Sequence, residues 1–359
     1  MDSILDRRAA IMGMAALTAG CTTLQRYRGR DLVQVNLADR AAVTLPPPPV
    51  PVPPDDGVSL QTSFDAVRRM TVPTFIDKAG PYTFVVDTGA NHSVMASELA
   101  AALTLPSGGR AAIHGIAGVD PAETVMVNRL TVGGLSSRRI RMPLLSRNFL
   151  GAEGLLGVNV LEGRRAKLDF RHNTFSIASS KDLPTANLRG RATRLPRPDL
   201  DPSVVVVPAR QRFGQLTIVD AEVEGVPVTA FLDSGAETTV GNLALRDAVL
   251  TREPGLRAQI LTVQLVSATG QTVGGELSSI PPLRLGGLRI GNLSCVFADL
   301  HTFRIWDLID RPAILIGVDV MRHFESIELD FGRSLVTFTT PRAPAPGVGV
   351  TPPVSAPTP

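Results

Sequence analysis

Two aspartates are candidate catalytic residues in this chain. Each of them ends an apolar run and is followed by a hydroxyl residue and a glycine. Residues 84–94 read FVVDTGANHSV, and residues 230–240 read AFLDSGAETTV. Asp87 and Asp233 are 146 positions apart (233 − 87) in the same local context. Each pattern predicts a buried strand that stops at a tight turn, where glycine can take a positive φ and a carboxylate is held at the strand's end.

Two such acids, each at the end of its own repeat, predict a pair of carboxylates brought face to face by pseudo-symmetry. Carboxylates that close together cannot both ionise cheaply, so they share one proton and titrate as a coupled pair. The ionised member can accept a proton from a water molecule, while the protonated member can hydrogen-bond a carbonyl oxygen. This chemistry would hydrolyse an amide through a tetrahedral gem-diol without a covalent enzyme intermediate.

The residues that flank the two motifs also repeat, and in the same order. The first half carries SVMASELAAALTL (93–105), IHGIAG (113–118), RLTVGGLSSRRIRMPL (129–144) and GLLGVNVLEGRRAKLDFRHNTFSI (154–177). The second half carries TTVGNLALRDAVL (238–250), VSATGQTVGG (266–275), LRLGGLRIGNLSCVF (283–297) and AILIGVDVMRHFESIELDFGRSLVTF (313–338). Internal repetition of this length indicates two copies of one structural unit.

These motifs and flanks resemble the aspartic proteases, and specifically their retropepsin-like branch. The resemblance spans both halves of the chain and implies an all-β fold of two retropepsin-like (acid protease) β-barrel lobes, with one or two short helices per lobe. The lobes would be related by a pseudo-two-fold axis. The implied activity is that of an aspartic endopeptidase in which Asp87 and Asp233 are the acid–base pair and the substrate is a protein or peptide.

The resemblance also assigns supporting roles around the two acids. The active-site loops would comprise Thr88, Gly89 and Ala90 in the first lobe and Ser234, Gly235 and Ala236 in the second, with the hydroxyls of Thr88 and Ser234 bonding across to the opposite loop. Packing beside these loops would come from Leu156, Gly157, Ile316 and Gly317. The flap candidates are Gly115, Ile116, Ala117 and Gly118. The corresponding stretch 267–271 is less rich in glycine, and neither stretch contains the flap tyrosine of pepsin-like enzymes.

Residues 1–21 have the plan of an export signal. A charged head with Arg7-Arg8 precedes an apolar stretch from residue 9 to residue 19, which is too short to span a bilayer, and small residues precede Cys21. Residues 18–21 resemble a bacterial lipobox, although Thr18 stands where leucine is usual. Cys21 would then be lipidated and anchor the exported chain to a membrane on its periplasmic side, with the Sec and twin-arginine routes both open.

The rest of the chain divides by composition. The polyproline run of residues 45–54 predicts an extended stalk, and residues 181–203 lose apolar periodicity and gain proline and arginine. The predicted boundaries are a signal at 1–21, a proline-rich stalk at 22–55, lobe one at 56–180, a linker at 181–203, lobe two at 204–340 and a disordered proline-rich tail at 341–359. So long a linker predicts that the lobes pair within one chain and that the protein is a monomer.

Several other classes of function find no support in the sequence. The net charge is +3 with a pI near 9.2, but basic and aromatic residues are not interleaved, so no nucleic-acid partner is predicted. The five histidines form no paired metal-ligand spacing, and we predict no metal and no cofactor. Ser93 and Ser234 lack a Gly-x-Ser-x-Gly setting. Cys295 lies in an apolar strand-like run, which favours core packing.

One alternative remains open at the level of sequence. A binding protein could keep the double-lobed cleft without turnover and capture an extended peptide by β-addition. The intact motif in both halves favours the enzyme, because a pure binder has no need for two acids that repel each other.

Overall fold

The computed structural model describes residues 15–16, 25–26, 57–180, 203–218 and 220–341. Apart from residues 15–16, 25–26, 203 and 341, the predicted signal with Cys21, the stalk, the linker and the tail lie outside the described residues. The described part of the chain is mostly β, with 53 % of the described residues in strands. No helix within the described ranges is long and apolar enough to cross a membrane.

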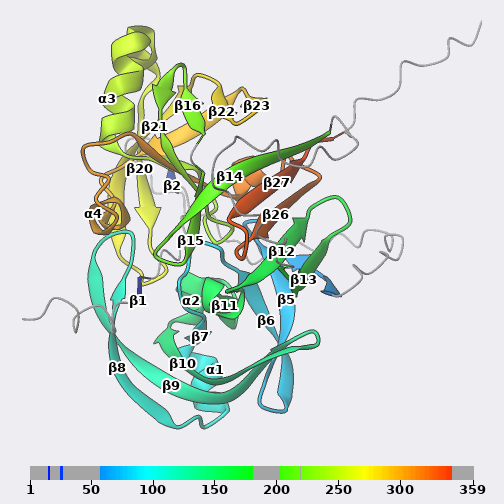
Figure 1. The fold of residues 1–359 in the computed structure, drawn as a ribbon. Helices are drawn as coiled ribbons and strands as arrows, with labels where there is room; N and C mark the ends of the chain where they lie inside the picture. The colour runs from blue at the N-terminus through cyan, green and yellow to red at the C-terminus, as the bar shows by residue number, and fades with distance from the viewer. Residues whose placement is uncertain (1–14, 17–24, 27–56, 181–202, 219, 342–359) are drawn as a thin grey trace, which may run out of the picture.

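Lobe one, residues 57–180, is built on a sheet that curls back on itself. The strand order is β8-β9-β10-β7-β11-β6-β5-β4, with β1 (Ala15–Ala16) added beside β8, and an additional pairing of β9 with β5 closes the barrel (Figure 1). Two short helices and one 3₁₀ turn complete it. The elements are β4 (Ser63–Phe64), β5 (Met70–Ile76), β6 (Ala79–Val86), β7 (Val94–Ala96), α1 (Ser97–Ala102), β8 (Ser107–His114), β9 (Val119–Val132), β10 (Leu135–Leu145), α2 (Arg147–Leu150), β11 (Gly154–Leu156) and η3 (Val158–Val160).

Lobe two, residues 203–341, repeats the strand order of lobe one in its main sheet and adds further elements. Its strands run in the order β20-β21-β24-β19-β25-β18-β15, and a separate small sheet has the order β17-β16-β22-β23. The elements are β15 (Gln215–Ile218), β16 (Ala221–Val223), β17 (Val226–Pro227), β18 (Thr229–Leu232), β19 (Val240–Gly241), α3 (Leu243–Arg252), η4 (Pro254–Gln259), β20 (Leu261–Val266), β21 (Thr272–Ile280), β22 (Leu283–Leu285), β23 (Leu288–Ile290), β24 (Leu293–Phe297), α4 (His301–Ile305), β25 (Ala313–Ile316) and α5 (Val318–Met321).

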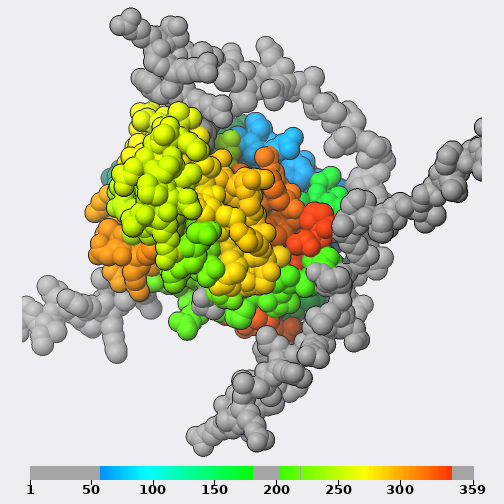
Figure 2. All heavy atoms as spheres, turned by 90° about the horizontal axis from the view of Figure 1, so that it is seen from above, coloured from blue at the N-terminus to red at the C-terminus, as the bar shows by residue number. Residues whose placement is uncertain are grey.

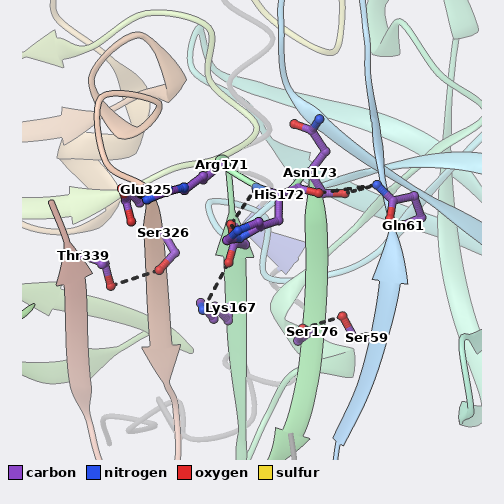
Figure 3. Close-up of polar contacts among 11 residues, drawn as sticks. Ser59, Gln61, Lys167, Arg171, His172, Asn173, Ser176, Glu325, Ser326 and Thr339 are labelled. Atoms are coloured by element: carbon purple, nitrogen blue, oxygen red, sulfur yellow. Dashed lines mark hydrogen bonds and ion pairs between the residues drawn. The ribbon is translucent and has the colours of Figure 1, made fainter. Parts of the chain in front are cut away.

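A shared sheet joins the lobes. It consists of β3 (Gly57–Gln61), β13 (Thr174–Ser179) and β12 (Arg164–Asp169) from lobe one and of β26 (Ser326–Asp330), β27 (Leu335–Thr339) and β14 (Val204–Arg212) from lobe two. The junction is the antiparallel pair β12–β26, and the ion pair Arg171–Glu325 crosses it (Figure 3). Seen from above, lobe two, coloured from green through yellow to red, covers most of the coloured surface, with lobe-one residues in blue beside it (Figure 2).

The strand before each aspartate is central in its sheet. β6 lies between β11, to which it runs parallel, and β5, to which it runs antiparallel, and β18 lies in the same way between β25 and β15. A strand buried on both faces favours a continuous apolar run, which is what residues 84–86 and 230–232 supply. The all-β fold with two retropepsin-like lobes, predicted from the sequence, is confirmed. Lobe two has α3, α4 and α5, one short helix more than predicted.

Two short strands from the N-terminal part of the chain extend the sheets at their outer edges. β1 (Ala15–Ala16) runs parallel to β8 beside Ile113 and His114, and β2 (Gln25–Arg26) runs antiparallel to β20 beside Val263 and Gln264. β8 and β20 are the first strands of the two flap hairpins. These hairpin edges therefore accept further extended backbone.

Candidate active site

The two motif aspartates lie at the ends of equivalent strands, Asp87 directly after β6 and Asp233 directly after β18. The three apolar residues before each of them are buried, with at most 4 % exposure. Asp87 and Asp233 are themselves 0 % and 1 % exposed. The fold thus removes two acids from water at the point where the lobes meet.

The two active-site loops approach each other most closely at Gly89 and Gly235. A Cβ atom added to Gly89 would lie 2.2 Å from Cγ of Asp233, and one added to Gly235 would lie 2.3 Å from Cγ of Asp87. Neither glycine has a positive φ, so the expected left-handed turn is absent from both loops. Glycine is needed here because the opposite carboxyl group occupies the place of a side chain. The two carboxyl groups therefore face each other.

Backbone N–H groups fix one oxygen of each carboxyl group. Gly89 and Ala90 both donate to Oδ1 of Asp87 at 2.9 Å. In lobe two, the N–H groups of the glycine and alanine that follow Asp233 donate to its Oδ1 at 2.9 and 3.1 Å. Among the described residues, no donor reaches Oδ2 of either aspartate. Each acid thus keeps its second oxygen for the opposite acid and for a reactant.

The hydroxyl residues of the motifs cross between the lobes. Thr88 Oγ1 donates to the carbonyl of Leu232 at 2.8 Å and accepts from the N–H of Ser234 at 3.0 Å. Ser234 Oγ mirrors this, donating to the carbonyl of Val86 at 2.7 Å and accepting from the N–H of Thr88 at 3.1 Å. These buried reciprocal bonds hold the two loops in one geometry, as the resemblance implies.

The predicted packing residues lie directly beside the loops. The N–H of Asp87 donates to the carbonyl of Leu156 at 3.0 Å, and the N–H of Asp233 donates to that of Ile316 at 2.9 Å. A Cβ atom on Gly157 would lie 2.5 Å from the backbone of His92. Gly317 is equally confined, with 2.8 Å to the backbone of residue 238. A side chain at either glycine would push the neighbouring loop away.

A polar layer behind these glycines was missed by sequence reasoning. In lobe one, Ser93 Oγ accepts from the N–H of Gly157 at 3.1 Å and donates to Asn159 Oδ1 at 2.9 Å. In lobe two, Thr239 Oγ1 accepts from the N–H of residue 317 at 3.1 Å and donates to Asp319 Oδ1 at 2.7 Å. The repeat offset carries the signal, because Thr239 lies 146 positions after Ser93 (239 − 93).

Burial and mutual repulsion set the protonation of the pair. Desolvation raises the pKa of Asp87 to about 6, although the Arg69 guanidinium and the loop N–H groups act to lower it. Desolvation, together with the negative charge of Asp87, raises the pKa of Asp233 well above its usual range. One proton on the pair is therefore favoured over two charges at neutral pH.

The lobe-one flap candidates form a turn that reaches the other lobe. The N–H of Gly115 donates to the carbonyl of Gly118 at 2.8 Å, which closes the turn between β8 and β9. Ile116 is 1 % exposed and belongs to the apolar cluster of lobe two that contains Trp306. The N–H of His301, at the start of α4, donates to the carbonyl of Ile116 at 2.8 Å. The tip of the lobe-one flap is thus packed against lobe two.

The corresponding stretch of lobe two also forms a flap turn. The N–H of Ser267 donates to the carbonyl of Gln271 at 2.7 Å. A Cβ atom on Gly270 would lie 2.5 Å from the Phe149 ring, so this tip rests on α2 of lobe one. Gln271 Nε2 donates to Asp120 Oδ1 on the other flap hairpin. Sequence reasoning singled out only the lobe-one flap, because a tip without several glycines gives little local signal.

A histidine pair joins the lobe-one flap to α4. His114 Nδ1 and His301 Nε2 lie 3.0 Å apart, and the rings stack with an interplanar angle of 5°. Desolvation lowers the pKa of both rings, and the neighbouring charges of His301 and Arg304 lower them further. A neutral pair, with one ring donating and the other accepting, is therefore favoured.

Two other kinds of reactive site, a metal site and a reactive thiol, find no support among the described residues. Within residues 57–180, 203–218 and 220–341, no three His, Cys, Asp or Glu side chains are grouped to hold a metal ion. Cys295 is fully buried in β24, and desolvation raises the pKa of its thiol far above the usual range. The aspartate pair is thus the reactive constellation that the described residues form.

Comparison with known families agrees with this geometry. A family model described as "gag-polyprotein putative aspartyl protease" matches residues 72–163, and a model described as "Aspartyl protease" matches residues 219–320. Each match contains one of the two aspartates with its flap. No curated protein matches the chain. The chain therefore carries two aspartyl protease domains of the retropepsin-like kind, one in each lobe.

Proposed function

We propose that the chain is an aspartic endopeptidase in which water held between Asp87 and Asp233 attacks a peptide bond. The observation that carries this proposal is the buried pair of carboxyl groups, one from each lobe. Backbone N–H groups fix the Oδ1 atom of each, and no donor among the described residues reaches either Oδ2 atom. An ordinary structural acid would satisfy both oxygens.

The reaction needs only these two acids and water. The ionised carboxylate accepts a proton from the water as its oxygen bonds to the scissile carbon, while the protonated acid donates its proton to the carbonyl oxygen. Collapse of the gem-diol breaks the C–N bond. The amine leaves with the proton taken from water, and the second acid regains its own proton. No covalent bond to the enzyme forms.

The flap hairpins indicate the shape of the substrate. β1 pairs with β8 and β2 pairs with β20, one parallel and the other antiparallel. Strand pairing of this kind binds the backbone of any extended peptide and leaves specificity to side-chain pockets. These contacts support a peptide or protein substrate that binds in extended form along the flap hairpins.

The same cleft would also serve the alternative, a peptide-binding protein without turnover. Incubation of the purified chain with a peptide library, followed by mass spectrometry, separates the two. The endopeptidase predicts new peptide termini that accumulate beyond one equivalent of protein. Peptides that are retained but never cut, across a pH range spanning 4 to 8, would instead support the binding protein.

One chain is expected to be the working unit, because β12 and β26 join the lobes in a continuous sheet within the chain. Specific activity should stay constant on dilution through the nanomolar range. A mixture of Asp87→Asn and Asp233→Asn chains should regain no activity, since each chain pairs its own lobes. Recovery in the mixture, or a steep loss of specific activity on dilution, would point to lobes that pair across chains.

We further propose that the chain is exported and held at a membrane through lipid on Cys21, in keeping with the signal-like plan of residues 1–21. Replacement Cys21→Ser should move the protein from the membrane fraction to the soluble fraction and leave peptide cleavage unchanged, because the site lies in the two lobes. Undiminished membrane retention of this variant would place the anchor elsewhere.

A further inference from the structure

The two lobes carry different residues at one buried position beside the active site. The offset of 146 that relates Asp87 to Asp233 also relates Arg69 to Gln215 (215 − 69). Their exposures are 2 % and 3 %. Each donates to the opposite lobe's active-site glycine: Arg69 Nη1 lies 3.3 Å from the carbonyl oxygen of Gly235, and Gln215 Nε2 bonds that of Gly89. The same place thus holds a cation in one half and a neutral amide in the other.

The Arg69 guanidinium is fixed in its orientation. Its Nε donates to Asp65 Oδ2 at 2.6 Å, and its Nη2 donates to the carbonyl of Leu150 at 2.6 Å. Asp65 in turn accepts from the N–H of Arg69 at 2.8 Å. A guanidinium does not lose its proton in a protein, so this buried charge is permanent. The residue that follows the lobe-two motif, Glu237, also feels this charge.

We propose that Arg69 is a positioning residue that fixes the shared proton on Asp233 and leaves Asp87 as the ionised acid. This inference rests on the proposed function and assigns a distinct role to each aspartate. Asp87 would take the proton of the attacking water and pass it to the leaving amine. Asp233 would donate to the carbonyl oxygen and regain its proton when the gem-diol collapses.

Charge supports this assignment. The Arg69 guanidinium is, after desolvation, the largest influence on the pKa of Asp87 and acts to lower it. The charge that bears most on Asp233 is instead the negative charge of Asp87, which raises its pKa. A neutral amide at residue 215 cannot offer Asp233 the same compensation. The two aspartates are therefore nearly symmetric in geometry but differ in their charged surroundings, because a buried cation favours the ionised form of Asp87 alone.

The titration of other ionisable groups around the guanidinium must be distinguished from that of the aspartate pair. Asp65 is its ion-pair partner, and burial raises the pKa of Glu237 to about 7, with Asp319 and Arg322 also acting on that carboxyl group. Titration of Glu237 would fall near neutrality and could be mistaken for the dyad. A Glu237→Gln variant therefore serves as the reference background for every pH measurement.

The test compares Arg69→Gln with Arg69→Lys, which keeps the charge, and with Asp65→Asn/Arg69→Gln, which leaves no buried charge unpaired. In profiles of kcat/KM against pH, loss of the cation should move the acid limb upward by about one pH unit, which is about a tenfold loss of rate below it. Arg69→Lys should keep the wild-type limb. KM should change little, because Arg69 contacts the loops and not the cleft.

Carboxyl titration decides the same point without turnover. The ¹³Cγ signals of Asp87 and Asp233, assigned through the Asn variants, should show Asp87 ionising first in the wild type, and this order should blur or reverse in Asp65→Asn/Arg69→Gln. If Asp233 ionises first in the wild type, or if the order is unchanged when the cation is lost, the inference fails. A chain that shows the expected titration but never cleaves peptide would instead refute the proposed function and the catalytic roles of the two acids, and only the placement of the proton by Arg69 would stand.

Discussion

Replacement of Asp87 or Asp233 by asparagine is expected to lower peptide cleavage by about a thousandfold, since general acid–base catalysis of this kind contributes ~10²–10⁴ per group. The amide can neither share the proton nor accept one from water. Each Asn Oδ1 can still accept the two loop N–H bonds that the wild-type carboxylate accepts, so the fold should survive. The measurement is kcat/KM on a peptide from the library.

A matched control is Asp310→Asn, which changes an exposed aspartate before the start of β25, at the end of that strand opposite Ile316, and should leave kcat/KM unaltered. Activity within a few-fold of the wild type in Asp87→Asn or Asp233→Asn would refute the proposed mechanism. If activity is lost, thermal unfolding of the variant shows whether its fold has survived. Only a folded, inactive variant supports the mechanism.

Thermal unfolding should also show how the stability difference between the Asp87→Asn variant and the wild type changes with pH. The folded-state pKa of Asp87 is about 6, above its ordinary value of 3.8, so the protonated form is the one that the fold favours. This contribution to stability is complete below pH 3.8 and is lost as the pH rises through about 6. The Asp87→Asn variant escapes that loss. Its stability relative to the wild type should grow as the pH rises from below 3.8 to well above 6, by about 3 kcal/mol for a shift of this size.

Replacement of Gly89 or Gly235 by alanine should be nearly as damaging to activity. The added Cβ would lie within 2.3 Å of the opposite aspartate's carboxyl carbon, closer than any real contact, so the loops must separate. Overpacking of this kind costs about 1–3 kcal/mol of stability. Because separation also breaks the facing arrangement of the acids, cleavage should fall by about a thousandfold, the loss predicted for removing an acid.

The control for these variants is Gly291→Ala, where an added Cβ meets nothing within 4 Å and φ is not positive. It should leave both stability and cleavage close to the wild type. Wild-type activity in Gly89→Ala would contradict the face-to-face arrangement. The same change at Gly235 tests the arrangement from the other lobe.

Much of the fold could be predicted from local sequence. An apolar run that ends in Asp-Thr-Gly or Asp-Ser-Gly encodes a buried strand and a confined loop within a few residues, so Asp87 and Asp233 could be singled out. The repeat then supplied the two-lobed, all-β architecture. The role of Gly89 was harder to see, since its side-chain place is occupied by the carboxyl group of Asp233, which lies 144 residues away in the sequence (233 − 89).

Other features depend on contacts that no local pattern encodes. Arg69 and Gln215 precede the aspartates by 18 residues (87 − 69), and only their common offset links them to the site. The histidine pair joins His114 on a flap to His301 on the other lobe. The two histidines are far apart in the sequence and meet only when the two lobes pack together, so no local sequence motif marks them. The β12–β26 junction of the shared sheet has the same origin.

The central claim, that the aspartate pair activates water for direct attack on a peptide bond, is tested most directly by single-turnover cleavage in ¹⁸O water with hydroxylamine present. The account predicts that the wild type places one ¹⁸O atom in each new C-terminal carboxylate and forms no hydroxamate, and that Asp87→Asn and Asp233→Asn form neither product. Hydroxamate from the wild type would reveal a covalent acyl intermediate, and undiminished cleavage by either Asn variant would remove the pair from the reaction; either result would contradict the account.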